Sequence, residues 1–266
     1  MIELPTERKK VENYNPNLIV LFGRPKSGKS SLMASLDSNL IIDLENGYRA
    51  LSVMCIQART AKDLFEIAQA VKEKTKQDGK APYKFITIDN ATRLEELSLS
   101  YALQLYRATP MGSTWQPKLG SDGKPMKDPK TNKIILDPKA DVRQLPNGAG
   151  YMYIRNAVKT LINMFKPLCE TLILVAHVKD KQIQKNGQEM TEFSVDLSGK
   201  TADIICGEAD AVGMVYREKN KTFITFEGGG DTIREARPIH LRGKKFEVAV
   251  SDESGNLNID MSKIFI

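Results

Sequence analysis

Short apolar runs that end at a glycine or a polar residue recur along the first two thirds of the chain. Between them lie stretches whose apolar residues repeat at helical spacing. Apolar runs of four to six residues are typical of buried strands. They are Leu18–Phe22, Leu40–Asp43, Val53–Ile56, Phe85–Asp89 and Leu172–Ala176. Strands that alternate with helices predict a mostly parallel, twisted sheet flanked by helices, an α/β fold.

Four helices are expected between these strands. One begins at Lys29, and one spans 60–78, where Thr60 and Asp63 have the spacing of a capping box. Two more have apolar faces at helical spacing, within 94–105 and 154–165.

Two polar segments interrupt this alternation. Residues 107–150 have no periodicity, are rich in Pro, Gly, Lys and Asp, and contain Trp115, the only tryptophan. Residues 178–200 form a second expected loop. Loops of this length within a domain are usually functional or disordered.

The last third predicts antiparallel strands. Residues 211–216 and 222–226 form an expected hairpin around 219–221, and 246–250 a last strand. The chain therefore divides into a flexible arm (1–16), one core (17–250) that carries the insertion at 107–150, and a C-terminal tail (251–266).

Composition narrows the class of protein. The chain has 266 residues, of which 41% are hydrophobic and 27% charged, as in ordinary globular domains. No run approaches the roughly 20 apolar residues of a membrane helix, so no membrane partner is expected. Three dispersed cysteines and two histidines argue against disulfide scaffolds and zinc fingers. The N-terminus lacks an apolar signal core, so a cytoplasmic location is predicted.

The net charge of +6 is unevenly distributed. The insertion at 107–150 has eight basic and four acidic residues, and eight minus four gives +4. Its basic residues are Arg107, Lys118, Lys124, Lys127, Lys130, Lys133, Lys139 and Arg143. A second basic cluster lies within 234–247.

A complete G-x-x-x-x-G-K-[ST] motif follows the first strand and precedes a helix. Glycines let the backbone wrap around phosphate groups, and a helix N-terminus adds positive potential. Lys29 is expected to bridge the β- and γ-phosphates and act in catalysis, and Ser30 to bind Mg²⁺. The expected nucleotide-binding residues are Gly23, Arg24, Pro25, Lys26, Ser27, Gly28, Lys29, Ser30 and Ser31.

Three further strand ends carry candidate chemistry. Asp89 is expected to hold Mg²⁺ with Ser30, and the alternative is that Asp89 or Asn90 caps the next helix. Asn90 stands where many ATPases place a water-activating glutamate, so Glu45 is the candidate general base, with Asp43 as its competitor. His177 can contact the γ-phosphate or attacking water, or merely bond a nearby carbonyl.

This order of motifs resembles the RecA-type recombinase core, and Ile42-Asp43-Leu44-Glu45 is similar to the segment that carries the catalytic glutamate there. More narrowly, the chain resembles phage-encoded RecA-core P-loop ATPases, including single-strand annealing proteins. The resemblance covers about residues 17–250. Its further supporting segments are 148–151, 174–181, 196–200 and 241–244.

The resemblance implies ATP hydrolysis with Mg²⁺ and single-stranded DNA bound by two loops, here 107–150 and 178–200. It also implies a homo-oligomeric ring or filament, and a single-strand-binding protein is a further candidate partner. Lysines can contact phosphates, and a tryptophan can stack on bases. The expected DNA-binding residues are Trp115, Lys118, Lys124, Lys179 and Lys181.

In such assemblies a neighbouring subunit supplies positive charge to the γ-phosphate. The candidates here are Arg234, Arg237, Arg242, Lys244 and Lys245. The sequence departs from the family in two respects. His177 stands where RecA has a glutamine, and no N-terminal oligomerisation domain is expected before residue 17.

Two other functions remain open. A nucleotide-gated scaffold would hydrolyse ATP slowly, and a small-molecule phosphotransferase would use the same phosphate loop. The second would need an arginine-bearing lid, whereas 107–150 is rich in lysine. If the chain is phage-encoded, its location is the host cytoplasm.

Overall fold

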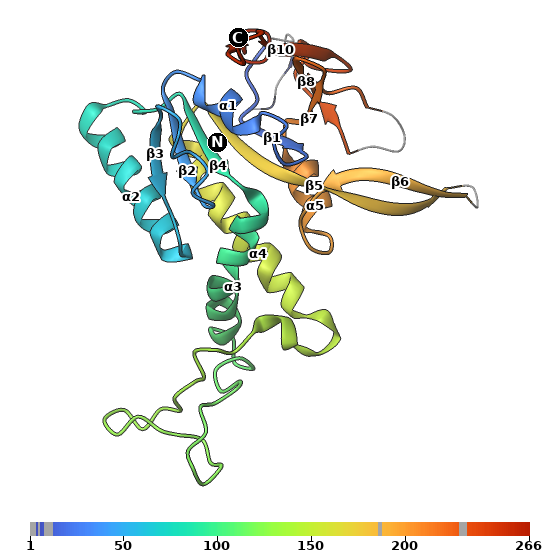
Figure 1. Ribbon diagram of the computed structural model, residues 1–266. Coiled ribbons are helices and arrows are strands. Elements are labelled where there is room, and N and C mark those ends of the chain that lie inside the picture. Colours follow the sequence, from blue (N-terminus) through green and yellow to red (C-terminus); the bar gives the residue numbers. More distant parts are fainter. Residues whose placement is uncertain (1–3, 5, 8–12, 186–187, 229–232) are drawn as a thin grey trace.

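The computed structural model describes residues 4, 6–7, 13–185, 188–228 and 233–266 (Figure 1). Its helices are α1 (Lys29–Ala34), α2 (Ala61–Asp78), α3 (Ala91–Arg107), α4 (Gly150–Phe165) and α5 (Thr201–Glu208). Its parallel strands are β1 (Leu18–Gly23), β2 (Asn39–Asp43), β3 (Met54–Gln57), β4 (Phe85–Asp89), β5 (Thr171–Lys185) and β7 (Ala211–Glu218). The remaining strands are β6 (Gln188–Val195), β8 (Lys221–Thr225), β9 (Glu235–Ala236), β10 (Lys245–Ser251) and β11 (Leu257–Ile259).

The described strands form a sheet in the order β11-β10-β8-β7-β1-β5-β4-β2-β3. From β7 to β3 all neighbours are parallel, and β8, β10 and β11 are antiparallel. The strand that precedes the phosphate loop, β1, is separated from β4 by β5. The predicted fold, a mostly parallel α/β sheet with antiparallel C-terminal strands, is confirmed.

Both faces of the central sheet are covered, which explains the continuous apolar runs. Side chains alternate along β1, so Leu18, Val20 and Phe22 join one apolar cluster with α2, α3, α4 and α5. Ile19 and Leu21 face the opposite cluster, which contains α1 and the end of the chain. The expected strand at 53–56 is the edge strand β3, and its four residues are exposed and not buried as their apolar run indicated.

The expected capping box of α2 is present. Thr60 Oγ1 accepts a hydrogen bond from the backbone N–H of Asp63, whose carboxylate accepts one from the backbone N–H of Thr60. Gly79 ends the helix with a φ of 68°, a left-handed conformation that glycine adopts without a steric penalty.

The segment at 178–200 is a β-hairpin and not the expected loop. β5 continues past His177, and Val178–Lys185 pairs antiparallel with Gln188–Val195. This ladder supplies backbone partners for a polar segment whose composition suggested a loop. The hairpin projects sideways from the sheet (Figure 1), and the unpredicted helix α5 follows it.

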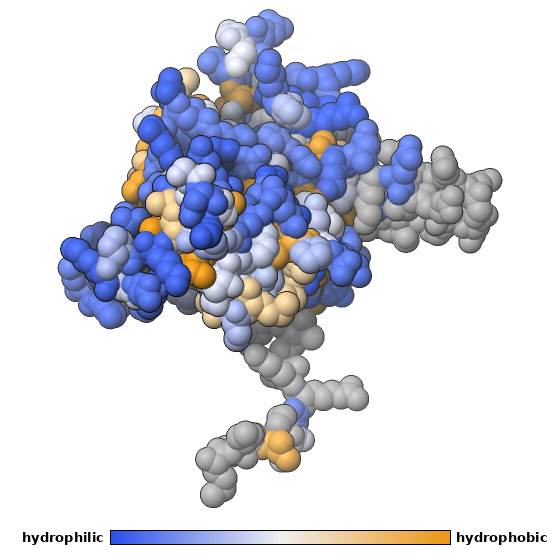
Figure 2. All heavy atoms as spheres, turned by 90° about the horizontal axis from the view of Figure 1, so that it is seen from below, coloured by the Kyte–Doolittle hydropathy of each residue, from blue (hydrophilic) through white to orange (hydrophobic). Residues whose placement is uncertain are grey.

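The insertion leaves the core at the end of α3 and returns at the start of α4, and it extends far below the sheet (Figure 1). Residues 108–149 contain two short 3₁₀ turns and three isolated bridges. The first of the three, Pro117 with Leu136, brings the two arms of the insertion together. Figure 2, viewed from that side, shows a mainly hydrophilic surface with small scattered apolar groups.

The core extends beyond the expected boundary at residue 250. β11 adds a strand to β10, and Ile264 and Phe265 are buried against the sheet. Asn15 donates a hydrogen bond to the backbone oxygen of Ile266, at 2.7 Å, so the described end of the N-terminal arm meets the C-terminus. None of the helices in the described part of the chain is both long and apolar enough to cross a membrane.

Candidate functional site

The phosphate loop connects β1 to α1 and has the backbone of an anion-binding turn. Lys26 and Gly28 have positive φ values of 61° and 98°, and alternation of handedness turns successive N–H groups toward one point. The Lys29 ammonium donates hydrogen bonds of 2.9 Å to the carbonyl oxygens of Gly23 and Arg24. The buried hydroxyl of Ser27 has no partner among the described residues. This buried, unpaired polar group fits a loop that contacts a phosphate.

The electrostatics of Lys29 also suit a bound anion. Burial lowers the pKa of the Lys29 ammonium, although the carboxylates of Asp89 and Glu45 act in the opposite direction. A phosphate group beside Lys29 would add the negative charge that a buried ammonium requires.

Asp89 ends β4 opposite the phosphate loop. Its Oδ2 accepts hydrogen bonds from Ser30 Oγ at 3.3 Å and from the hydroxyl of Tyr48 at 2.6 Å. Burial raises the pKa of the Asp89 carboxyl, and the bonds from Tyr48 and Ser30 with the charge of Lys29 only partly oppose this. A hydroxyl and a carboxylate side by side are oxygen ligands of the kind that Mg²⁺ takes, with phosphates and water completing its shell. The residues present therefore fit the ion.

The residue that caps the helix after this strand is Asn90. The side chain of Asn90 accepts a hydrogen bond from the backbone N–H of Arg93 and caps α3. Asp89 is therefore not needed as the cap of that helix.

The structure distinguishes Asp43 from Glu45. Asp43 is buried, and its Oδ1 accepts backbone N–H bonds from Glu45, Asn46 and Gly47 at 3.0, 2.6 and 3.2 Å. These bonds hold the turn after β2 and occupy the carboxylate. The side chain of Glu45 is 46% exposed, and its Oε2 lies 3.6 Å from Nε2 of His177. Glu45 is thus the carboxylate available to orient water.

His177 lies inside β5, in register with Gly23, and does not end a strand as expected. Its Nε2 is 2.9 Å from Nδ2 of Asn90, and its Nδ1 is buried without a partner among the described residues. The ring therefore touches side chains from two neighbouring strand ends, those of β2 and β4.

These groups share one cavity of about 300 Å³ at the carboxyl edge of the parallel strands. Such edges are where ligands bind in open parallel sheets. The cavity is lined by Pro25, Lys26, Gly28, Lys29, Ser30, Ser31, Asp43, Glu45, Gly47, Tyr48, Asp89, His177 and Arg217. Of the expected nucleotide-binding residues, Gly23, Arg24 and Ser27 belong to the same turn without lining the cavity.

Three lining residues, Gly47, Tyr48 and Arg217, were not predicted from the sequence. Tyr48 follows a turn and belongs to no motif, so no local signal marks it. Arg217 directly follows the apolar run at 211–216, which is a usable signal, but that strand was expected to be only antiparallel. It pairs parallel with β1, and this pairing brings its end to the phosphate loop.

The expected DNA-binding residues lie apart from the cavity, in the insertion and the hairpin. Trp115 is half-buried and packs edge-on against Tyr106, with ring centroids 5.3 Å apart, so its ring is part of the packing. Lys118 and Lys124 are exposed on the insertion. Lys179 donates a hydrogen bond to the carbonyl of Leu197. The backbone of Lys181 is in β5, but its side chain lies outside the described residues.

Among the cations proposed to act on a neighbouring subunit, Arg237, Arg242 and Lys245 make contacts in their own chain. Arg237 forms a 3.3 Å ion pair with Asp210, and Arg242 donates to the carbonyl of Arg237. Lys245 lies over the ring of Phe223, 4.1 Å from its centroid. The structure does not test their expected role.

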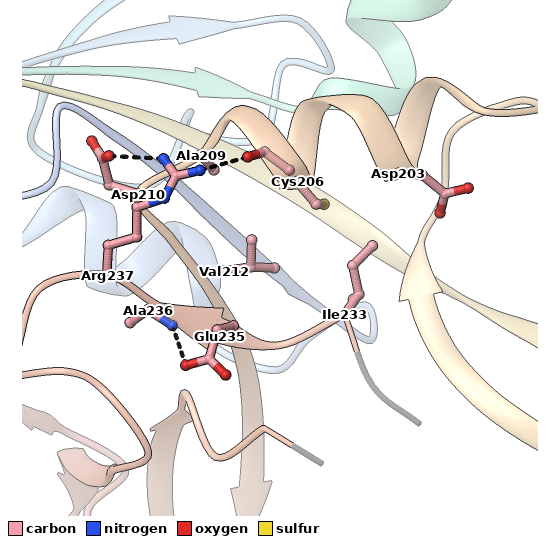
Figure 3. A pocket seen from close by; sticks show the side chains of 10 residues that line it. Asp203, Cys206, Ala209, Asp210, Val212, Ile233, Glu235, Ala236 and Arg237 are labelled. Carbon is pink, nitrogen blue, oxygen red and sulfur yellow. Dashed lines mark hydrogen bonds and ion pairs between the residues drawn. The ribbon is translucent and has the colours of Figure 1, made fainter. Parts of the chain in front are cut away.

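The pair Arg237–Asp210 lies at a second cavity of about 390 Å³, between α5 and β7 (Figure 3). Arg237 also donates to the carbonyl of Gly207, and Asp210 accepts from the backbone N–H of Asn17 at 2.9 Å. These bonds hold the C-terminal strands against the start of β1, at the end opposite the phosphate loop.

Comparisons with known proteins identify the family of the chain. No curated protein sequence matches the chain. A KaiC-like protein from the hyperthermophilic archaeon Pyrococcus horikoshii OT3 aligns in structure over 93% of this chain and 91% of its own, with a TM-score of 0.44 and 13% identity. A family model described as an AAA domain matches residues 15–116 and 127–239. The chain therefore belongs to this AAA-domain family of nucleotide-binding P-loop proteins.

Proposed function

We propose that the chain binds ATP with Mg²⁺, hydrolyses the γ-phosphate, and couples this reaction to single-stranded DNA in phage recombination, annealing or replication. The observation that carries the proposal is the position of His177. Its ring lies 3.6 Å from the Glu45 carboxylate, and the same strand continues directly into the projecting β5–β6 hairpin. One strand thus connects the site of hydrolysis with a candidate DNA-binding element.

Different residues of the site would bind the phosphates, hold the metal ion and orient the attacking water. Lys29 and the loop N–H groups bind the phosphates, and Ser30 and Asp89 would hold Mg²⁺, which supplies charge neutralisation when bound. Glu45 accepts a hydrogen bond from the attacking water and orients it toward the γ-phosphate. His177, beside Glu45, senses whether that position is filled.

A second interaction supports coupling to the hairpin. The guanidinium of Arg24, in the phosphate loop, lies 5.8 Å from the ring centroid of Phe193 in β6. A movement of Arg24 on nucleotide binding would therefore change its cation–π contact with Phe193. This contact would transmit the change to the hairpin in addition to β5.

The insertion supports the choice of DNA as partner. It carries an excess of four positive charges on a hydrophilic extension. Each phosphate contact with single-stranded DNA releases counterions and steepens the salt dependence of binding.

The first test is ATP hydrolysis with and without single-stranded DNA, with Lys29→Ala as the blank. The proposal expects stimulation by DNA and no turnover by the variant. Turnover that ignores DNA would contradict the coupling and favour a scaffold with slow hydrolysis or a phosphotransferase. Transfer of phosphate to a nucleoside or nucleotide would distinguish these two.

The second test measures DNA affinity against salt for the paired substitution Lys118→Ala and Lys124→Ala. The slope of log K against log salt should become shallower by about 0.7 for each DNA phosphate that no longer binds a lysine. The matched control substitutes Lys72 and Lys76, two exposed lysines of α2, by alanine. An equal change of slope in both variants would show that DNA binding depends only on the net charge of the protein and not on Lys118 and Lys124.

A further inference from the structure

Arg217 belongs to a strand that passes directly beside the phosphate loop. β7 pairs parallel with β1, with Met214 in register with Phe22. At the next position the strands approach so closely that a Cβ on Gly23 would lie 2.2 Å from the carbonyl oxygen of Val215. β7 then continues past the end of β1, so Arg217 stands beside the loop that follows Gly23.

The second glycine of the loop lies next to Arg217. A Cβ on Gly28 would lie 3.8 Å from Nε of Arg217 and 3.6 Å from Oγ1 of Thr222. Arg217 lines the same cavity as Lys29 and Ser30. Its side chain therefore borders the space that the phosphates of a nucleotide require.

The donors of Arg217 are available for an anion. Within the described residues its side chain makes one weak hydrogen bond, from Nε to Thr222 Oγ1 at 3.4 Å, and no ion pair with a carboxylate is found there. A guanidinium has five N–H donors in a planar fork that suits phosphate oxygens. Thr222, the partner of Nε, is buried, and Arg217 itself lines the cavity, so its remaining N–H donors are free to bind a ligand there.

We propose that Arg217 binds the phosphates of the nucleotide held by its own chain, on the side of the α- and β-phosphates. Gly28 caps the N-terminus of α1, and the backbone of such loops cradles the α- and β-phosphates. The candidate water-positioning group, Glu45, belongs instead to the turn after β2. Arg217 is thus a nucleotide-binding residue that needs no neighbouring subunit. This inference rests on nucleotide binding at the proposed site and not on hydrolysis or DNA.

The test is equilibrium binding of fluorescently labelled ADP and of a non-hydrolysable ATP analogue to Arg217→Ala and Arg217→Lys. Removal of a charge-assisted hydrogen bond to phosphate should weaken both nucleotides by roughly 10- to 100-fold in the alanine variant. The lysine variant, which keeps the charge but not the fork, should fall between it and the wild type. Lys221→Ala is the matched control, because Lys221 is on the same hairpin but pairs with Glu247 on the surface.

The outcomes separate this inference from the proposed function. Wild-type protein that binds neither nucleotide would overturn the site itself. Wild-type binding with ADP affinity unchanged in Arg217→Ala would overturn only the role of Arg217. If Arg217→Ala bound only the ATP analogue more weakly, the proposed contact with the α- and β-phosphates would also be wrong, because Arg217 would then bind the γ-phosphate. If the alanine variant melts early, Arg217→Gln, which retains most of the side chain, replaces it in the same comparison.

Discussion

The hydroxyl of Tyr48 donates a 2.6 Å hydrogen bond to Asp89 Oδ2, the oxygen that Ser30 Oγ also contacts at 3.3 Å. Burial, followed by the charge of Asp89, raises the pKa of Tyr48 far above its ordinary value. The Tyr48 hydroxyl therefore keeps its proton, and remains a donor, at neutral pH. A donor fixed on the candidate metal carboxylate orients that carboxylate before any ion arrives.

This relationship makes a prediction for Tyr48→Phe. Loss of an outer-shell hydrogen bond typically weakens metal binding 10- to 100-fold. We expect the Mg²⁺ concentration for half-maximal ATP hydrolysis to rise about tenfold. Tyr101→Phe, on α3, is the control for loss of a tyrosine hydroxyl. An unchanged or lower Mg²⁺ requirement would show that Tyr48 does not support the metal site.

Asp89→Asn should change how stability depends on pH. Burial raises the pKa of Asp89, so the native state binds this proton more tightly than the unfolded chain, whose carboxyl has a pKa of about 3.9. The free energy of unfolding of the metal-free wild type therefore falls as pH rises from the unfolded pKa through the raised native pKa. The variant lacks this loss, and its Tm at pH 7 should be about 2–5 °C higher without nucleotide or Mg²⁺.

Asp63→Asn is the control with the opposite sign. Hydrogen bonds from the backbone of Arg59 and from Thr60 lower the pKa of Asp63. The free energy of unfolding that Asp63 contributes is present above the pKa that it has in the unfolded chain. This contribution is lost as pH falls through the lower pKa that Asp63 has in the native protein. Thermal melting of both variants from pH 4 to 8 checks the pair. A Tm gain for Asp89→Asn that persists unchanged at pH 4 would contradict the electrostatic explanation.

Glu45→Gln should separate binding from hydrolysis. Glutamine keeps the shape of the side chain but cannot act as a base, so ATP affinity should stay within about twofold while turnover falls about 10²- to 10⁴-fold. Asp43→Asn should behave differently. Asp43 accepts three backbone N–H bonds through one oxygen, so its variant should lose thermal stability. Unchanged turnover in Glu45→Gln would remove Glu45 from the reaction.

Phe193→Ala should weaken the coupling between nucleotide and DNA. The substitution removes the ring that lies under Arg24, so we expect DNA stimulation of hydrolysis to fall while turnover without DNA is kept. Glu192→Ala, the adjacent residue of β6, points to the other face of the strand and is the control. Equal stimulation in both variants would exclude a role for the interaction between Arg24 and Phe193.

Local patterns in the sequence were sufficient for much of the fold. Apolar runs predicted the central strands because a parallel sheet buried on both faces requires them. The phosphate loop was identified because its glycines and lysine are adjacent in sequence. The capping box of α2 was also predicted, because Thr60 and Asp63 interact over three residues.

The hairpin after His177 was missed because its strands are polar and gain their partners only from each other. Lys179 and Asp180 have the composition of a loop, yet each pairs across the ladder, with Ser194 and Phe193 respectively. An apolar run marks a strand only where the strand is buried. This hairpin projects away from the core and has no such run, so the sequence pattern did not indicate strands there (Figure 1).

The sequence alone determined the α/β fold class, the phosphate loop and the polar residues that follow apolar runs, Glu45, Asp89 and His177, because each depends on residues close together in the chain. Only the tertiary structure decided that Asp43 is occupied by its own turn, that Tyr48 binds Asp89, and that Arg217 reaches the loop. Those relationships depend on sheet order and on the path of a turn. The turn is held by the hydrogen bonds that Asp43 accepts from Glu45, Asn46 and Gly47, which the apolar pattern does not report. The sheet order is set by packing between segments up to about two hundred residues apart, which no local pattern encodes.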